Sequence, residues 1–582
     1  MGTTRGETLV DLSRWRAEEH SDRTLYHFLD DGSEGGATLT FGALHRRSGA
    51  IAQALREFVE VGERVLIVLP PGPDFVSAFF GCQYAGVVAI PTLAPHPARP
   101  DRGLPRIRAI LRDARPAAIL TSEGLRAAIG PPLLEDPGSP PDRLLAVDQI
   151  DETRASDWRP PAITAESLAL LQYTSGSTGE PRGVMITHGN LLHNLGIIRE
   201  AFGADERSVG VFWLPFHHDM GLIGGVLEPL FCGGQSTFLS PVEFIQRPIR
   251  WLQLITELGA TISGGPNFAY DECVRRIAPE QREALDLHSW EVAFCGAEPV
   301  HAETLNRFAE AFAPAGFRRE AYFPCYGLAE ATLMVTGGEK QEPPVVAPKP
   351  GSDTPGTAAE FPSELRSAPA RMLVGCGSVR GGQRVVVVDP ETCHPLGEGE
   401  VGEIWVAGAS VGQGYWGRPE PSAQVFNARM ADGQGPFLRT GDLGFLQGRE
   451  LFVTGRLKDL IIISGRNHYP HDIERTAQGS HPAIRDNGCA AFAVETEQQE
   501  HLILVAEVDP HVARRRARED GPRDSSAIVQ AIRRAVSEEH GLTPQRVVLV
   551  RAMAIPRTSS GKIRRLACRE HFLARDLQTV EA

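Results

Sequence analysis

A run of small hydroxyl residues and glycines at residues 173–184, YTSGSTGEPRGV, carries groups that suit phosphate binding. Hydroxyl groups donate hydrogen bonds to an anion, and glycines let the backbone fold closely enough for its N–H groups to point at one. The apolar run at residues 168–171 and the helical pattern at residues 190–201 predict a strand before this loop and a helix after it. The candidate phosphate ligands are Thr174, Ser175, Gly176, Ser177, Thr178, Gly179 and the cation Arg182.

The loop differs from the Walker pattern G-x-x-x-x-G-K-[ST], which disfavours a kinase or a GTPase. A Ser/Gly-rich run can also be a flexible linker. The strand-like run directly before this one favours a phosphate loop instead.

Two adjacent histidines and an aspartate in residues 213–221, WLPFHHDMG, raise the question of a metal site. We expect none, because consecutive side chains of an extended segment point to opposite sides and no further ligand cluster is visible. A structural histidine is the commoner case.

Short apolar runs alternate with longer amphipathic segments along the first part of the chain. The runs at residues 64–70, 117–122, 210–215 and 291–295 predict buried strands, since continuous apolar runs of this length suit a sheet covered on both faces. Residues 41–58 predict a helix, and residues 75–91 predict a buried helix that leads into a strand. This alternation predicts an α/β fold class with parallel strands, whose ligands bind beyond the carboxyl ends of the strands.

The character of the sequence changes after about residue 375. Residues 383–389, 403–407 and 450–453 predict the strands of a small β-rich unit. After residue 455, strands at 490–494 and 502–508 precede a helix that begins near Ser525 or Ser526 and ends at Gly541. Residues 337–371 are rich in proline, alanine and glycine with little periodicity, which predicts a long functional or disordered loop.

The order of these segments resembles that of the adenylate-forming superfamily, which includes acyl-CoA synthetases, peptide-synthetase adenylation domains and fatty acyl-AMP ligases. The likeness runs from about residue 9 to residue 572. It implies a large N-terminal domain of layered α/β sheets over residues 1–454, with the β-rich unit at about 375–454. A hinge at residues 455–458, centred on Lys458, and a small mobile α+β domain at residues 459–582 would follow.

The resemblance also implies the cofactors ATP and Mg²⁺ and a role for each motif. Residues 294–300, FCGAEPV, would lie against adenine, and the aromatic ring of residues 326–332, YGLAEAT, would stack on it. The glutamate of that second motif would hold Mg²⁺, for which one carboxylate beside phosphate oxygens is enough. The implied nucleotide and metal residues are Gly296, Ala297, Glu298, Tyr326, Gly327, Leu328, Ala329 and Glu330.

The resemblance places further residues at the reaction itself. His218 would line the entrance for the carboxylate and acyl chain, and Asp442 in RTGDLGF would accept both ribose hydroxyls, although a hairpin turn also explains a Gly-Asp pair. Arg456 would lie on the ribose and phosphate side. Lys562 in PRTSSGKIRR would contact the carboxylate and the α-phosphate, although a lone lysine in such a loop is normally solvated surface.

Several strings favour the fatty acyl-AMP ligase branch, namely WLPFHHDMGL, GRNHYPHDIE and LVGCGSV. Ala329 stands where many superfamily members have threonine, and the insertion typical of this branch would occupy residues 337–371. This branch makes fatty acyl-AMP and pyrophosphate from a fatty acid and ATP. It passes the acyl group to the phosphopantetheine of a separate acyl carrier protein, here of a polyketide or nonribosomal peptide synthetase. Arg182 departs from the usual lysine; it keeps the charge but is bulkier and forked.

Two other functions stay open. A fatty acyl-CoA ligase would use free CoA as the acceptor of the acyl group. An inactive adenylate-binding scaffold would not react at all, but the joint presence of Lys562, Glu330 and Asp442 disfavours it.

The composition of the chain bears on its binding partners and its cellular compartment. The net charge of −14 disfavours a nucleic-acid binder, since phosphate binding is driven by Lys and Arg. Nine dispersed cysteines predict reduced thiols. No signal peptide is expected. No membrane span is expected either, because the most apolar stretch is shorter than the ~20 residues a span needs. We therefore expect a cytoplasmic enzyme.

Overall fold

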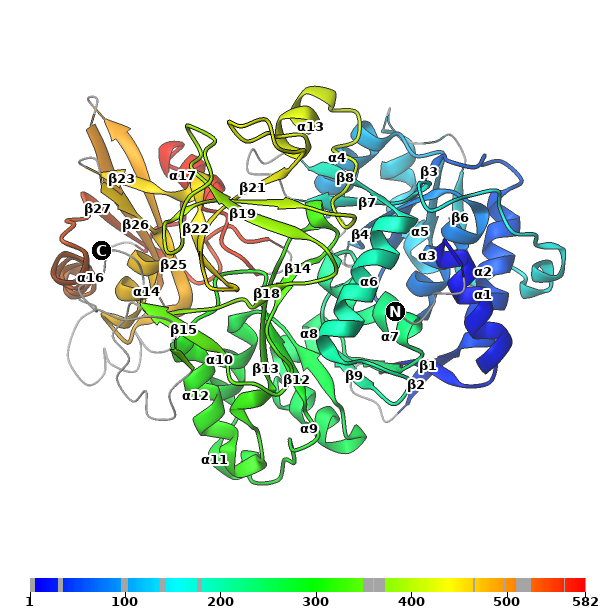
Figure 1. Ribbon diagram of the computed structural model, residues 1–582, viewed down its shortest axis with the longest axis horizontal. Coiled ribbons are helices and arrows are strands. Elements are labelled where there is room, and N and C mark those ends of the chain that lie inside the picture. The colour runs from blue at the N-terminus through cyan, green and yellow to red at the C-terminus, as the bar shows by residue number, and fades with distance from the viewer. Residues whose placement is uncertain are drawn as a thin grey trace. The chain divides into compact units, whose positions relative to one another are not determined.

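The computed structural model describes residues 6–29, 35–95, 103–136, 138, 140, 143–174, 181–348, 359–360, 372–463, 466–496, 499–508, 525–558 and 561–580. These residues form two compact units (Figure 1). Unit 1 extends to Val453 without residues 441–443, and unit 2 contains residues 441–443 and the chain from Thr454 onward. The predicted domain limits and the hinge at 455–458 stay predictions.

The first sheet of unit 1 has the strand order β6-β5-β3-β4-β7-β8. Its strands are parallel except for the antiparallel pair β7 and β8. The predicted strands at 64–70 and 117–122 are confirmed, and the buried helix α3 (Pro73–Ala85) does lead into a strand. The strands are β3 (Arg64–Leu69), β4 (Val88–Leu93), β5 (Ala118–Thr121), β6 (Leu144–Ala146), β7 (Leu168–Thr174) and β8 (Arg182–Thr187).

The second sheet of unit 1 has nine strands in the order β18-β14-β13-β12-β11-β9-β10-β1-β2. The six strands from β13 to β1 are parallel, so their carboxyl ends lie at one edge. This confirms the predicted α/β class. The strands are β1 (Thr24–Leu29), β2 (Gly36–Thr40), β9 (Val209–Phe212), β10 (Gln235–Phe238), β11 (Ile262–Gly264), β12 (Val292–Cys295), β13 (Tyr322–Gly327), β14 (Met334–Gly337) and β18 (Ser378–Val379).

The helices of unit 1 begin and end at residues that favour these positions. Helix α6 begins after Thr187, whose side chain forms a capping box with Asn190, and ends at Gly203 in the left-handed conformation. Helix α2 stops at Leu55, three residues before the predicted end. The other helices are α1 (Leu9–His20), α4 (Leu104–Ala114), α5 (Glu123–Leu134), α7 (Glu228–Cys232), α8 (Pro241–Gln246), α9 (Ile249–Leu258), α10 (Asn267–Arg276), α11 (Pro279–Arg282), α12 (Ala302–Phe312) and α13 (Pro419–Phe426); α2 is Phe41–Leu55 and α6 His188–Phe202.

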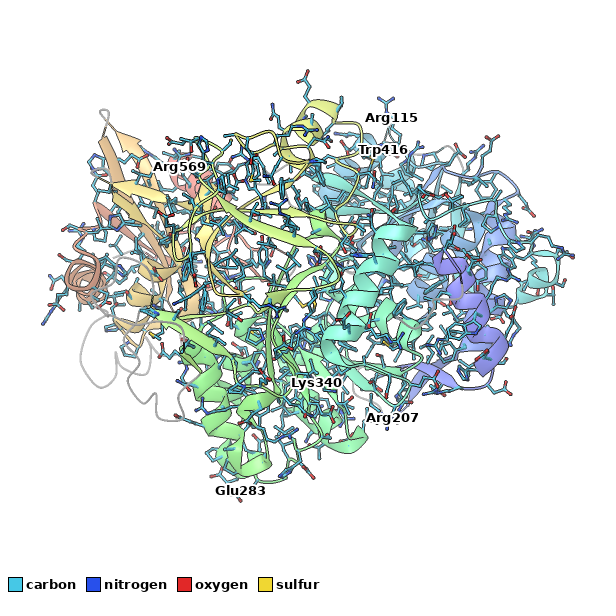
Figure 2. The ribbon with its side chains drawn as sticks, viewed as in Figure 1. Arg115, Arg207, Glu283, Lys340, Trp416 and Arg569 are labelled. Carbon is cyan, nitrogen blue, oxygen red and sulfur yellow. The ribbon has the colours of Figure 1, made fainter. Side chains whose placement is uncertain are left out.

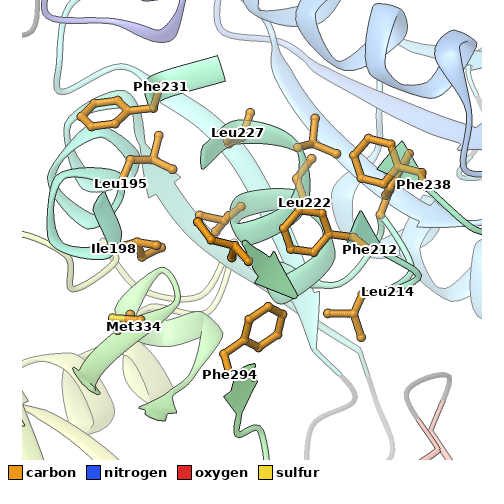
Figure 3. Close-up of a cluster of buried hydrophobic side chains, with 14 of the residues drawn as sticks. Leu195, Ile198, Phe212, Leu214, Leu222, Leu227, Phe231, Phe238, Phe294 and Met334 are labelled. Carbon is orange, nitrogen blue, oxygen red and sulfur yellow. The ribbon is translucent and has the colours of Figure 1, made fainter. Parts of the chain in front are cut away.

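Buried aromatic and branched side chains fill the space between the second sheet and its helices. Figure 3 shows Phe212, Leu222 and Phe294 in one such cluster. Leu222 belongs to a π-helical turn, Met220–Leu227, that follows the histidine pair. Charged side chains such as Arg207 and Glu283 lie at the periphery instead (Figure 2).

The β-rich region contains two small sheets. The predicted strands are confirmed as β19 (Arg384–Val388), β20 (Gly402–Ala407) and β22 (Glu450–Arg456), which join β21 (Leu438–Gln447) in one four-stranded sheet. Residues 337–371 were expected to be irregular, but β15 (Val345–Pro348) pairs with β16 (Ala359–Glu360) and with β17 (Met372–Val374). Backbone pairing across the segment overrides its weak periodicity. Residues 349–358 and 361–371 lie outside the described chain.

Unit 2 contains an antiparallel pair, β25 (Ile484–Thr496) and β26 (Gln499–Val508), next to the parallel strand β27 (Arg546–Arg551). The two predicted strands and the predicted helix, α16 (Ser525–His540), are confirmed. Sequence analysis did not identify β27 or the helices α14 (Pro470–Gly479) and α17 (Arg565–Leu573). The short hairpin β23 (Ile461–Ile463) and β24 (Arg466–His468) completes the unit.

Two further observations concern the described residues as a whole. All nine cysteines are among them, and each is a free thiol. None of their helices is both long and apolar enough to cross a membrane.

Glu228 is a fully buried carboxyl at the start of α7, lining a small cavity with Phe212 and Gly224. Its Oε1 accepts a hydrogen bond from the Cys232 thiol at 2.9 Å, while its Oε2 has no partner among the described atoms. Burial raises the pKa of Glu228 from 4.5 to about 8. The carboxyl is therefore protonated at neutral pH in the folded chain.

We expect the free energy of unfolding to decrease as pH rises from about 5 to about 8, and the variant Glu228→Gln to lack part of this decrease. The unfolded chain releases this proton near pH 4.5 and the folded chain only near pH 8, so rising pH favours the unfolded state across that window. Urea unfolding at pH 5.5 and pH 8 should show a difference on the order of a few kcal/mol. Glu283→Gln, at an exposed site, is the control, and equal pH slopes for wild type and Glu228→Gln would contradict the assignment.

Candidate active site

The ends of the predicted phosphate loop are Thr174, the last residue of β7, and Arg182, the first residue of β8. These two residues face each other in the antiparallel register. Arg106 from α4 donates a hydrogen bond to the carbonyl oxygen of Tyr173 at 3.3 Å, and the Tyr173 hydroxyl donates to Asp113 at 2.6 Å. The hairpin of β7 and β8 is thus anchored on α4. Ser175, Gly176, Ser177, Thr178 and Gly179 lie outside the described residues.

Glu330 and Arg182 both contact one aromatic side chain, Tyr415. The Tyr415 hydroxyl donates a hydrogen bond to Glu330 Oε1 at 2.9 Å. The Arg182 guanidinium carbon lies 5.5 Å from the centroid of the Tyr415 ring. The structure therefore brings the predicted metal ligand and the predicted phosphate cation to the same place, through a residue that sequence analysis did not identify.

The predicted adenine turn follows β12 and is held by Asn267, which sequence analysis also missed. Asn267 Nδ2 donates to Glu298 Oε1 at 3.0 Å and to the Pro299 carbonyl at 2.9 Å, and its Oδ1 accepts from the His301 N–H at 3.0 Å. Ala297 has a φ of 70°, a conformation that alanine rarely adopts. The side chain of Asn267 is 3% exposed, so its hydrogen bonds are made in the interior of unit 1.

The motif after β13 turns sharply. A Cβ at Gly327 would lie 1.8 Å from the carbonyl oxygen of Leu333, so only glycine fits there. Leu328 donates its N–H to that same oxygen at 3.0 Å, and Ala329 begins a 3₁₀ turn that contains Glu330. Tyr326, at 7% exposure, is mostly buried. Since β12 and β13 are parallel neighbours, the adenine turn and this motif leave the sheet at one edge.

The histidine pair follows β9, at the same edge of the sheet. Residues 216–217 form a turn and His218 lies in a bend, so the expectation of an extended segment with opposed side chains was wrong: the His217 and His218 rings lie 4.5 Å apart, centroid to centroid. Burial, and next to it the neighbouring His218, lowers the pKa of His217 well below its usual range, which keeps His217 neutral. Among the described residues, no three His, Cys, Asp or Glu side chains gather to hold a metal.

In unit 2, Asp442 and Arg456 form an ion pair, with Arg456 Nε 2.9 Å from Asp442 Oδ1. Asp442 lies within strand β21 and is 6% exposed, which argues against the alternative of a plain hairpin turn. Lys458 lies in the 3₁₀ turn Leu457–Asp459 that follows β22.

Lys562 lies in a tight loop of unit 2. Thr558 donates its N–H to the Lys562 carbonyl at 2.8 Å, and Lys562 donates its N–H to Thr558 Oγ1 at 3.0 Å. Three residues further, the half-buried Arg565 pairs with Asp459 at 2.9 Å and with Glu474 at 2.7 Å. Sequence analysis missed Arg565, because nothing in the string KIRR distinguishes an arginine that forms ion pairs from a solvated one.

The site residues therefore form two groups. Unit 1 brings together the flanks of the phosphate loop, Glu330, the adenine turn with Gly296, and the histidine pair at His218. Unit 2 holds Asp442, Arg456, Lys458 and Lys562. Their chemical roles stay predictions.

Comparison with protein families gives two matches that together cover most of the chain. Residues 13–416 match the AMP-binding enzyme family, and residues 458–582 match the family described as "Disco-interacting protein 2-like, AMP domain". The first match alone covers more than half of the chain.

Curated relatives are similar over nearly their whole length. The medium-chain-fatty-acid–[acyl-carrier-protein] ligase JamA of Moorena producens is 44% identical over 99% of this chain and 96% of its own. The long-chain-fatty-acid–AMP ligase FadD32 of Mycolicibacterium smegmatis is 38% identical over 98% of this chain and 94% of its own.

Solved structures agree with these relatives. A fatty acid AMP ligase from Legionella pneumophila is 40% identical, with a TM-score of 0.74 over 99% of this chain and 97% of that one. A structure described as a fatty acyl-adenylate ligase from L. pneumophila in complex with acyl adenylate and pyrophosphate matches equally well. This chain belongs to the AMP-binding enzyme family, in the branch of its fatty acyl-AMP ligase relatives.

Proposed function

We propose that this protein joins a fatty acid to the AMP part of ATP and then delivers the acyl group to the phosphopantetheine thiol of an acyl carrier protein. The observation that carries the proposal is the grouping of Glu330 and Arg182 around Tyr415, beside the hairpin that bears the predicted phosphate loop. A carboxylate and a cation at this place suit a nucleotide polyphosphate and its counter-ion. The relatives named as fatty-acid–AMP and fatty-acid–carrier-protein ligases support the choice of substrates.

In this reaction a carboxylate oxygen attacks the α-phosphorus of ATP, and the bond from that phosphorus to pyrophosphate breaks. Both reactants are anions, so catalysis consists largely of positioning and charge neutralisation. Arg182 would neutralise the leaving pyrophosphate, and Lys562 would contact the carboxylate and the α-phosphate together. His218, at the end of β9, would line the entrance for the fatty acid. The adenine turn Gly296–Ala297–Glu298 and Tyr326 would hold the base.

Two residues of unit 2 would bind the ribose. The carboxylate of Asp442 has several acceptor positions, so it can keep its ion pair with Arg456 and still accept ribose hydroxyls. Arg456 would then face the phosphate side of the nucleotide.

The residues present fit Mg²⁺. This ion takes one or two carboxylates together with substrate phosphate oxygens. Glu330 is a carboxylate that accepts a hydrogen bond from Tyr415, whose ring also contacts Arg182. Glu330 would hold the ion, which when bound would screen the charge of the phosphates.

We also propose a cellular compartment for the enzyme and a source for its carrier protein. The nine free thiols suit a reducing compartment, so we place the enzyme in the cytoplasm. The carrier protein would belong to a polyketide or nonribosomal peptide synthetase. An inactive scaffold would be indicated instead if ATP–pyrophosphate exchange did not depend on fatty acid.

We predict that Lys562→Ala abolishes acyl-adenylate formation while ATP still binds. Removal of one preorganised charge at a reacting centre costs on the order of 10²–10³ in rate. ATP–pyrophosphate exchange measures the reaction, and calorimetric titration measures ATP binding. Arg534→Ala removes an exposed cation from the same unit and should keep the wild-type rate. Wild-type exchange in Lys562→Ala would refute the role of this lysine.

The acceptor is predicted to be a carrier protein. With a medium-chain or long-chain acid, ATP and either free CoA or a phosphopantetheinylated carrier, we expect acyl transfer to the carrier and little acyl-CoA. Mass spectrometry of the carrier and chromatography of CoA products give the two rates. Acyl-CoA formed as fast as the adenylate would identify a CoA ligase and leave the adenylation step intact.

A further inference from the structure

Tyr415 contacts two predicted site residues at once, Glu330 and Arg182. The hydroxyl donates to Glu330 Oε1, and the ring face carries the guanidinium of Arg182. Burial and the neighbouring Glu330 carboxylate raise the pKa of Tyr415 above its usual range, so the phenol keeps its proton and acts as the donor. Arg182 and Glu330 are 148 residues apart along the sequence, and Tyr415 lies 85 residues beyond Glu330.

The Tyr415 ring is held rigidly in unit 1. It is 6% exposed and packs edge to face against Phe426, with ring centroids 5.1 Å apart. The backbone N–H of Tyr415 donates a hydrogen bond to Ser422 Oγ at 2.8 Å. Ring packing against Phe426 and the backbone hydrogen bond to Ser422 thus both connect Tyr415 to α13.

The backbone around Tyr415 is tied to both partners. We name residues 410–416 the strap. Within it, Gly412 donates its N–H to the Glu330 carbonyl at 2.9 Å, and Trp416 donates to the Gly183 carbonyl at 2.8 Å. Met185 of β8 donates its N–H to the Gly414 carbonyl at 2.9 Å. The strap thus links the strand that leaves the phosphate loop to the turn that carries Glu330.

We propose that Tyr415 is a positioning residue that sets the orientation of Glu330 toward Mg²⁺ and of Arg182 toward the phosphates. This inference rests on the proposed adenylation function. A hydrogen bond to one oxygen fixes the rotation of a carboxylate, which otherwise turns freely about its last bond. A guanidinium on an aromatic face keeps its N–H donors in its own plane, where they can reach an anion at the same time.

The same geometry gives a reason for arginine at position 182. A planar guanidinium can stack on the Tyr415 ring and still donate hydrogen bonds from its edge. A lysine ammonium on the ring would be a single point charge, without a fixed plane of donors. Arg182 and Tyr415 are therefore expected to work as a pair.

The test begins with Tyr415→Phe, which removes only the hydroxyl. Mn²⁺ serves as the probe for the Mg²⁺ site, and its binding in the presence of a non-hydrolysable ATP analogue is measured by electron paramagnetic resonance. We expect about 10-fold weaker Mn²⁺ binding, the size of one lost hydrogen bond to a charged group. In ATP–pyrophosphate exchange, the Mg²⁺ requirement should rise while the KM for fatty acid stays unchanged.

Tyr322→Phe is the matched control, because Tyr322 is also buried and its hydroxyl donates to a carbonyl, that of Leu305, at 2.7 Å. If Tyr322→Phe and Tyr415→Phe behave alike, or if Tyr415→Phe binds Mn²⁺ as the wild type does, the inference is overturned. Should Tyr415→Phe fail to fold, Ser422→Ala loosens the Tyr415 backbone more mildly and should weaken Mn²⁺ binding to a smaller degree. Unchanged binding in a folded Ser422→Ala variant would then count against the inference.

A double-mutant cycle tests the pairing with Arg182. Tyr415→Leu removes the ring, and Arg182→Lys removes the plane of donors. If the two residues act together, the loss of affinity for the ATP analogue in the double variant is smaller than the product of the two single losses. Independent effects would refute the pairing. Absence of fatty-acid-dependent exchange in the wild type would instead refute the proposed function, while the Mn²⁺ measurement would still report on Tyr415.

Discussion

The parallel pairing of β12 with β13 determines where the predicted nucleotide-binding motifs of unit 1 can lie. Parallel strands end at the same edge of their sheet, so the two turns that follow them emerge side by side. Both turns require close backbone approach: a Cβ at Gly296 would meet the Cys325 carbonyl oxygen at 2.7 Å, and one at Gly327 would meet the Leu333 carbonyl oxygen at 1.8 Å. A side chain at either glycine would push the strands apart or unfold the turn.

The strap completes this arrangement from a distant part of the chain, and helix α6 holds it. Asn190 donates from Nδ2 to the Val411 carbonyl at 3.1 Å, and Asn194 donates to Ser410 Oγ at 3.0 Å and to the Met334 carbonyl at 2.9 Å. These amides are buried, so their loss would leave carbonyl groups without partners in the interior. The polar face of α6 thus connects the strap to the strand that follows Glu330.

Local patterns predicted much of the fold. A continuous apolar run such as residues 64–70 predicts a buried strand whatever its neighbouring strands are. Local patterns failed where pairing with a distant segment decides the structure. The strands β15 and β16 have weak periodicity of their own, and β27 is a short apolar run that sequence analysis passed over, although it lies beside β26. The histidine pair was assigned to an extended segment, because a turn between Trp213 and Asp219 has no glycine to mark it.

The site shows the same division. Motif residues such as Asp442 and Glu330 were predicted from their resemblance to motifs of a known family. Sequence analysis missed Asn267, Tyr415 and Arg565. Each of them matters through its contacts with other residues of the chain. A buried asparagine or tyrosine has no spacing rule that separates it from an ordinary core residue. Only the distances to Glu298 and Glu330 identify two of them.

Arg565 shows what such a supporting residue does for Lys562. Its guanidinium joins Asp459, directly after the predicted hinge residue Lys458, to Glu474 of α14 and to the start of α17. Loss of Arg565 would leave the Glu474 carboxylate, which is 7% exposed, without this cation. The start of α17, three residues after Lys562, is therefore attached to Asp459 and Glu474, both of which follow Lys458 in the sequence. If the chain rotates at Lys458, as the family resemblance implies, this attachment makes Lys562 move together with Asp459 and Glu474. A change of a few backbone angles would then relocate the charge of Lys562 without reorganising the loop that presents it.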